Sequence, residues 1–138
     1  SIQDAINNGH VSVIDWFKNS GLKFEYSKIA FNNAIGNANF GVLIWFKNSD
    51  LKLKYSDKGI RSAVVNGHLN ILQWLKFNEL NYNYKNICED AATYNRIDIL
   101  SWLKENNLLF VDEIECYTIS KIIGNNYFDT LKFLLENG

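Results

Sequence analysis

Proline and methionine are absent from this 138-residue chain, and cysteine is scarce. The two cysteines, Cys88 and Cys116, form no Cys-x-x-Cys motif, so we expect two small core side chains in a reducing compartment rather than a disulfide or a metal site. The chain lacks an initiator methionine and opens within a recurring pattern, which suggests a piece of a longer protein.

Other absences argue against several classes of function for this chain. No apolar run reaches the roughly 18 residues that a membrane span needs, and the start does not read as a signal peptide. The formal net charge is −1, and the only arginines are Arg61 and Arg96, so strong attraction to nucleic acid is not expected. The carboxylates are scattered, and no phosphate loop or nucleophile motif is present, so we predict a protein that is not an enzyme and needs no cofactor.

What the chain does have is one pattern that occurs five times. Trp16, Trp45, Trp74 and Trp102 mark four copies and Phe133 the fifth, at spacings of 29, 29, 28 and 31 residues. A period in this range is typical of arrays of stacked repeats. We place the repeats at about residues 1–26, 27–55, 56–84, 85–112 and 113–138, within one domain covering 1–138.

Each repeat is predicted to contain two short helices. In the first helix, apolar or small residues recur at spacing i, i+3, i+4, which places them on one helical face; an example is Ile60, Ala63 and Val64. A turn rich in Asn and Gly follows, because these residues tolerate the left-handed conformation that ends a helix. The second helix carries apolar columns, the tryptophan column and then a lysine column on its solvated face.

The connectors between repeats alternate apolar and polar residues, as in Leu22, Phe24 and Tyr26. This alternation predicts an extended segment with one buried face. Ser27, Ser56, Asn86 and Asp112 stand where helix N-caps are expected.

The stretch Ala-Val-Val-Asn-Gly-His-Leu-Asn-Ile-Leu-Gln-Trp-Leu, residues 63–75, resembles the ankyrin repeat, in which Ala-Ala, two variable residues and Gly-His precede a Val/Leu-rich helix. The resemblance covers all five repeats and is weakest in the fifth. The period is shorter than the family's 33 residues, and Thr-Pro-Leu-His is missing. This short form with Trp and many Asn residues is similar to repeats of giant amoeba-infecting viruses and AT-rich protists.

The resemblance implies an all-α, ankyrin-like solenoid of about five helix-turn-helix repeats, with short connectors in place of β-hairpin fingers. It implies a monomeric protein–protein interaction module that binds a protein of unknown identity, and in viral forms such modules often recruit host proteins. The expected location is cytoplasmic, in the host cytoplasm if the protein is viral. Two alternatives stay open: a structural spacer within a larger protein and, more remotely, a binder of single-stranded nucleic acid.

Contact residues of the ankyrin family lie at two variable positions before the Gly-His turn and at the connector tips. The matching turn residues here are Asn7, Asn8, Gly36, Asn37, Val65, Asn66, Thr93 and Tyr94. The matching connector residues are Tyr26, Lys28, Tyr55, Lys58, Tyr84 and Lys85. Tyr94 is the strongest candidate, because repeats one to three have asparagine there and the scaffold therefore needs no aromatic. The connector tyrosines have a competing role, which is to pack beneath the next repeat.

Two other constellations have simpler interpretations than a binding site. The four tryptophans could stack on bases, but each lies within an apolar stripe, so core packing is favoured. His10 and His68 occupy equivalent turn positions without converging metal ligands, so a hydrogen bond that stabilises the turn is favoured.

Overall fold

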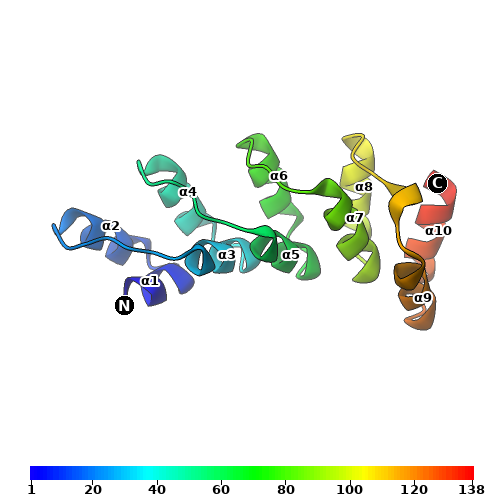
Figure 1. Cartoon of the computed structure of the whole chain (residues 1–138), viewed down its shortest axis with the longest axis horizontal. Helices are drawn as coiled ribbons and strands as arrows, with labels where there is room; N and C mark the ends of the chain where they lie inside the picture. Colours follow the sequence, from blue (N-terminus) through cyan, green and yellow to red (C-terminus); the bar gives the residue numbers. More distant parts are fainter. The chain divides into compact units, whose positions relative to one another are not determined.

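The computed structural model describes all of residues 1–138 and is all-helical, with ten α-helices, one 3₁₀ helix and no strand (Figure 1). The prediction of an all-α protein without a sheet is therefore confirmed. The first five helices are α1 (Ile2–Asn7), α2 (Val11–Asn19), α3 (Lys28–Gly36), α4 (Phe40–Asn48) and α5 (Asp57–Val65). The others are α6 (Leu69–Phe77), α7 (Tyr84–Thr93), α8 (Ile97–Glu105), η1 (Val111–Glu113), α9 (Cys116–Gly124) and α10 (Phe128–Asn137).

The chain divides into two compact units, Ser1–Ala63 and Val64–Gly138. In the first unit α1 packs against α2 and α3, and α4 packs against α2 and α3. In the second unit α7 packs against α8 and α9, and α10 packs against α8 and α9. In both units, therefore, helices contact their partner within a repeat and a helix of the neighbouring repeat.

The predicted helical face is buried in α3, α5 and α7, whereas in α9 Ile123 of the same predicted face is 61% exposed. Phe31, Ala34 and Ile35 of α3 have no exposed surface, and the small Ala34 allows a neighbouring helix to approach closely. The Phe31 ring meets the Phe46 ring edge-on, with centroids 5.4 Å apart. Burying a side chain of this size contributes about 1.5–3 kcal/mol. The second unit has an equivalent core, which includes Leu72, Leu75, Ile99, Leu100 and Leu103.

The turn after each first helix adopts a repeated geometry. A residue with positive φ ends the helix, and it is Gly9, Ala38, Gly67, Asn95 or Asn126. In four of the turns, the backbone N–H of the residue after the positive-φ residue donates a hydrogen bond to the carbonyl five residues earlier. The His10 N–H bonds to the Ala5 carbonyl in this way at 2.8 Å, and the Arg96 N–H bonds to the Ala91 carbonyl at 2.8 Å. This bond pattern satisfies the last carbonyls of the helix, so the predicted helix-ending role of these turns is confirmed.

Two predicted N-caps are wrong. Helix α7 begins at Tyr84 with Asn83 as its N-cap, and Asn83 Oδ1 accepts the N–H of Lys85 at 3.0 Å, so Asn86 lies within the helix. Helix α9 begins after Glu115, because Asp112 belongs to η1. In both places an acceptor side chain closer to the helix start, or an extra 3₁₀ turn, determines where the helix begins.

Candidate functional site

A hollow of about 510 Å³ lies in the second unit, where three helix ends meet. Its lining comes from the end of α7, the end of α9 and the start of α10, and consists of Thr93, Tyr94, Lys121, Gly124, Asn125 and Tyr127. Tyr94, Gly124 and Asn125 are solvent-exposed, so the hollow is open at the surface. Thr93 and Tyr94 are two of the contact residues predicted from the sequence, and the structure brings them together in this hollow.

Polar contacts fix the wall that α7 and α9 form beside the hollow. Thr93 Oγ1 donates to the Glu89 carbonyl at 2.8 Å, which holds the threonine side chain against its own helix. The Glu89 carboxylate accepts hydrogen bonds from the Thr118 hydroxyl and, at 3.2 Å, from the Glu115 N–H. Thr118 is buried and Glu89 half-buried, so the Thr118 bond in this link is partly shielded from water and joins α7 to α9.

The repeat register explains which residues the sequence interpretation missed. Gly124 and Asn125 occupy the same two turn positions in the fifth repeat that Thr93 and Tyr94 occupy in the fourth. The fifth repeat matches the ankyrin pattern weakly, so these two residues were not among the candidates. The register of the Asn-Asn-Tyr turn at residues 125–127 was the signal that could have identified them, together with Tyr127.

Gly124 also explains why the space is empty. A Cβ atom added at Gly124 would meet nothing within 4 Å. The equivalent glycine of the second repeat, Gly36, is fully packed, and an added Cβ there would lie 2.5 Å from Ser62 Oγ. The space beside Gly124 is therefore open, whereas Ser62 fills the space beside the equivalent Gly36.

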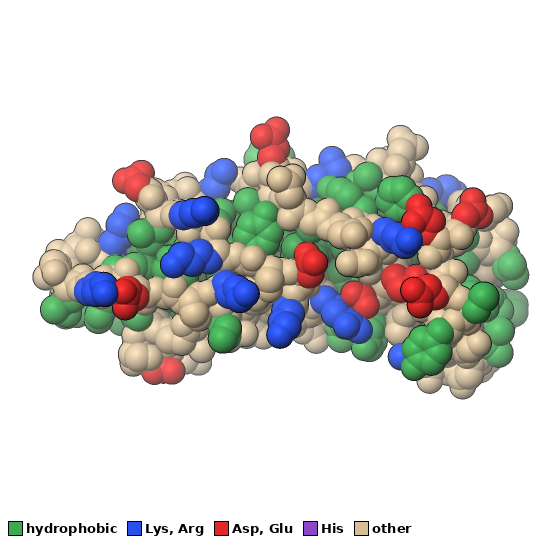
Figure 2. All heavy atoms as spheres, viewed as in Figure 1, with side chains coloured by type: hydrophobic (Ala, Val, Ile, Leu, Met, Phe, Trp, Pro, Cys, Tyr) green, Lys and Arg blue, Asp and Glu red, His purple; other side chains and the backbone are tan.

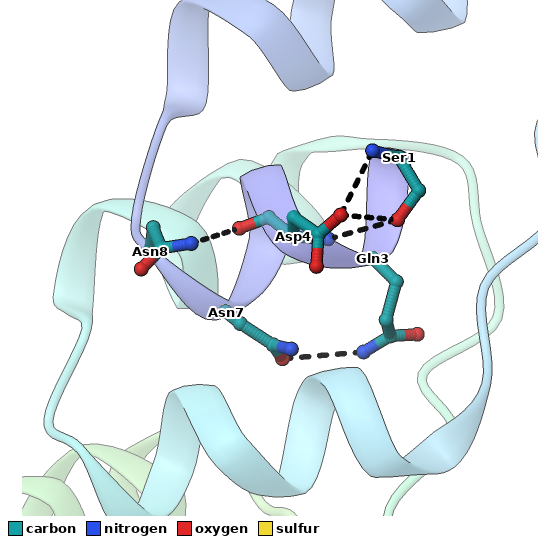
Figure 3. Close-up of polar contacts among 5 residues, drawn as sticks. All are labelled: Ser1, Gln3, Asp4, Asn7 and Asn8. Atoms are coloured by element: carbon teal, nitrogen blue, oxygen red, sulfur yellow. Dashed lines mark hydrogen bonds and ion pairs between the residues drawn. The ribbon is translucent and has the colours of Figure 1, made fainter.

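The remaining predicted turn residues lie outside this hollow. Asn8 and Asn37 are exposed, and Asn8 Nδ2 donates to the Asp4 carbonyl at 2.8 Å, which closes the end of α1 (Figure 3). Asn7 is half-buried, and its side-chain oxygen accepts from Gln3 at 3.2 Å and from Asn33 at 3.0 Å. Gly36 is buried, Val65 is half-buried, and Asn66 is exposed.

The connector tyrosines are half-buried and make contacts within the protein. The Tyr26 ring lies 4.6 Å from the Phe46 ring, its hydroxyl donates to the Lys52 carbonyl, and burial raises the pKa of this phenol. The ring centroids of Tyr55 and Phe31 lie 6.3 Å apart, and those of Tyr84 and Tyr82 lie 4.7 Å apart. These contacts support the packing role that competes with partner binding.

The connector lysines Lys28, Lys58 and Lys85 are all exposed. Lys85 Nζ lies 2.8 Å from a carboxylate oxygen of Glu113, and the hydrogen bond to that carboxylate raises the pKa of Lys85. At an exposed pair the interaction contributes little to stability. A partner-binding role for these lysines stays a prediction.

Three expectations about individual side chains need correction. Trp102 is 7% exposed and the Trp45 and Phe24 ring centroids lie 5.6 Å apart, as core packing predicts, but Trp16 is 65% exposed. His10 and His68 are the N-cap residues of α2 and α6, and neither side chain makes a capping hydrogen bond. Cys88 is buried, and burial raises the pKa of its thiol, whereas Cys116 is exposed.

Hydrophobic side chains are also open to solvent over the α9 and α10 region (Figure 2). In α10, Leu135 is 75% exposed at the position where the other four repeats carry lysine. Exposed apolar side chains therefore lie on the same helices that line the hollow.

Comparisons with protein-family models, with curated proteins and with solved structures find no match to this chain. None of its helices is both long enough and apolar enough to cross a membrane. No group of three or more His, Cys, Asp or Glu side chains is placed to hold a metal ion. The function is therefore inferred from the geometry of the chain itself.

Proposed function

We propose that this chain is a non-enzymatic protein-interaction module that holds a segment of a partner protein in the hollow beside Tyr94. The observation that carries the proposal is Tyr94 itself. It is 37% exposed, lines the hollow, and replaces the asparagine found at this position in the other repeats. Tyrosine is a favourable anchor for a partner because it buries a large rigid surface while its hydroxyl still finds a hydrogen-bond partner.

The proposal includes the arrangement of the repeats. We infer that the five helix pairs stack as an ankyrin-like solenoid, and the recurring turn geometry and the packing between neighbouring repeats within each unit support this. Small-angle X-ray scattering tests the arrangement directly. A compact domain of this length would have a radius of gyration of about 14 Å. A clearly larger value for the monomer is expected of a solenoid, and a value near 14 Å would contradict it.

The binding function is tested by selecting peptides from a random displayed library on the purified wild-type chain. Peptides that enrich should lose affinity about tenfold for the Tyr94→Ala variant, because an interface anchor contributes about 1–2 kcal/mol or more. Phe110→Ala is the matched control, since Phe110 is also 37% exposed but does not line the hollow.

Selected peptides should bind Phe110→Ala as they bind the wild type. If no peptide enriches, or if both variants bind equally well, the hollow is not a peptide site. The alternative role of a spacer within a larger protein would then be favoured.

A further inference from the structure

Three of the polar side chains that line the hollow can donate hydrogen bonds and are not used within the chain. The Tyr94 and Tyr127 phenols make no hydrogen bond to another residue, and neither does the Asn125 side-chain amide. Thr93 is the exception, because its hydroxyl is already bonded to Glu89. Two phenol O–H groups and one amide N–H₂ in the lining are therefore available to a bound group.

Lys121 adds the only charged group of the lining. It lies in the last turn of α9, is half-buried, and forms no ion pair within the chain. Its ammonium lies 4.6 Å from the centre of the Tyr117 ring, which holds it on the helix surface without neutralising its charge. Like Lys121, most lysines of the chain form no ion pair, whereas Lys85 pairs with Glu113 at 2.8 Å and Lys23 with Glu25 at 2.6 Å.

We propose that the hollow recognises a carboxylate, namely the side chain of an Asp or Glu residue in the bound partner segment. This inference rests on the proposed function and specifies the chemistry of its partner. One unpaired cation and three side chains with free donors line the same hollow, and together they complement a single negative charge with several acceptor lone pairs. A phosphate group carries nearly twice that charge and is typically bound by arginine clusters. No arginine lines this hollow, so a phosphopeptide fits it less well.

The test uses peptides selected from the random displayed library on the full chain. We expect them to share an Asp or Glu at one fixed position, and replacing it by Asn or Gln should weaken binding about tenfold. Lys121→Gln should cause a similar loss and should make the chain indifferent to that replacement. Lys104→Gln is the matched control, because Lys104 is an exposed, unpaired lysine in the last turn of α8 and lies outside the hollow.

The outcomes separate this inference from the proposed function. Peptides that depend on Tyr94 but carry no fixed acidic residue would overturn the carboxylate proposal and leave the interaction function intact. Peptides that prefer phosphoserine to glutamate at the fixed position would also overturn it. Peptides whose binding does not depend on Tyr94, or a failure to select any peptide, would contradict both. Because a surface charge pair is screened by salt, the affinity of acidic peptides should also fall with ionic strength, and that of their amide versions should not.

Discussion

Asn39 and Tyr127 occupy equivalent positions, as N-caps of the second helix in their repeats, and they interact differently with the preceding repeat. In the first compact unit, Asn39 Nδ2 donates to the Asn7 carbonyl at 3.2 Å and so joins the turns of two repeats. In the second unit, Arg96 serves in the same way, donating from Nε to the Val65 carbonyl at 3.1 Å. Tyr127 makes no such bond, and the hollow lies beside it.

The comparison extends to the residues before the turn. In the first unit, Asn7 bonds to Gln3 (Figure 3). Asn7 also bonds to Asn33, and Gly36 packs closely on Ser62. At the hollow, Gly124 meets no neighbour and Asn125 makes no side-chain hydrogen bond. The same register positions therefore join repeats in one region and leave groups free for a ligand in another. A repeat scaffold can gain a binding site in this way without changing its helices.

The largest difference in stability is expected between alanine substitutions of two tryptophans in the same column, Trp102 and Trp16. Trp102→Ala should lower the free energy of unfolding by about 3–5 kcal/mol, because the ring is 7% exposed and its removal leaves a cavity. Trp16→Ala should change it by less than about 0.5 kcal/mol, because that ring is 65% exposed. Urea denaturation of both variants measures this difference. Similar losses for the two would mean that Trp16 is covered in solution.

The second-largest difference in stability is expected between alanine substitutions of the two equivalent glycines, Gly36 and Gly124. Gly36→Ala should destabilise the protein by about 1–3 kcal/mol, because the added methyl group would lie 2.5 Å from Ser62 Oγ and 2.8 Å from its Cβ. Gly124→Ala should be neutral or stabilise by up to about 1 kcal/mol, because the position is open and alanine favours a helix. Thermal unfolding followed by circular dichroism distinguishes the two. A destabilising Gly124→Ala variant would show that the hollow is filled in solution.

The asparagines give a smaller effect. Asn7→Ala should cost about 1 kcal/mol, since it removes the acceptor of two side-chain hydrogen bonds at a half-buried site. Asn125→Ala should change stability by less than about 0.5 kcal/mol, because its side chain bonds to no other residue. Chemical denaturation of the two variants side by side is the check. Equal costs would remove the distinction between the turns that join repeats and the turn at the hollow.

Tyr94 should show the smallest effect on folding. Tyr94→Ala should change the free energy of unfolding by less than about 0.5 kcal/mol, as expected for an exposed side chain that forms no hydrogen bond. The same denaturation experiment measures it. A loss of several kcal/mol would place Tyr94 in the core of its repeat and would make its effect on binding uninformative.

Much of the fold could be predicted from local patterns. The i, i+3, i+4 spacing located the first helices, and the Asn and Gly residues located the turns, because both depend on neighbours along the chain. Burial in a column was less predictable, since it depends on whether a neighbouring helix is present. Trp16 is exposed, although Trp102 in the same column is buried.

The candidate site could be predicted only in part. Thr93 and Tyr94 followed from the ankyrin resemblance, and the structure places both at the hollow. Lys121, Gly124, Asn125 and Tyr127 come from the fifth repeat, where the resemblance is weakest. Their role arises from what is missing at their positions, namely a side chain at residue 124 and the joining bond at residue 127. A pattern of residue types does not reveal such absences.

The most direct test of the central claim is a nuclear magnetic resonance titration of the ¹⁵N-labelled chain with a selected acidic peptide. If the hollow is the binding site, the largest amide shift changes should fall on Thr93, Tyr94, Lys121, Gly124, Asn125 and Tyr127. The equivalent turns of the first unit, at Asn7, Asn8, Gly36 and Asn37, should be unaffected. Shift changes centred on those turns, or spread along the connectors at Tyr26 and Tyr55, would contradict the account.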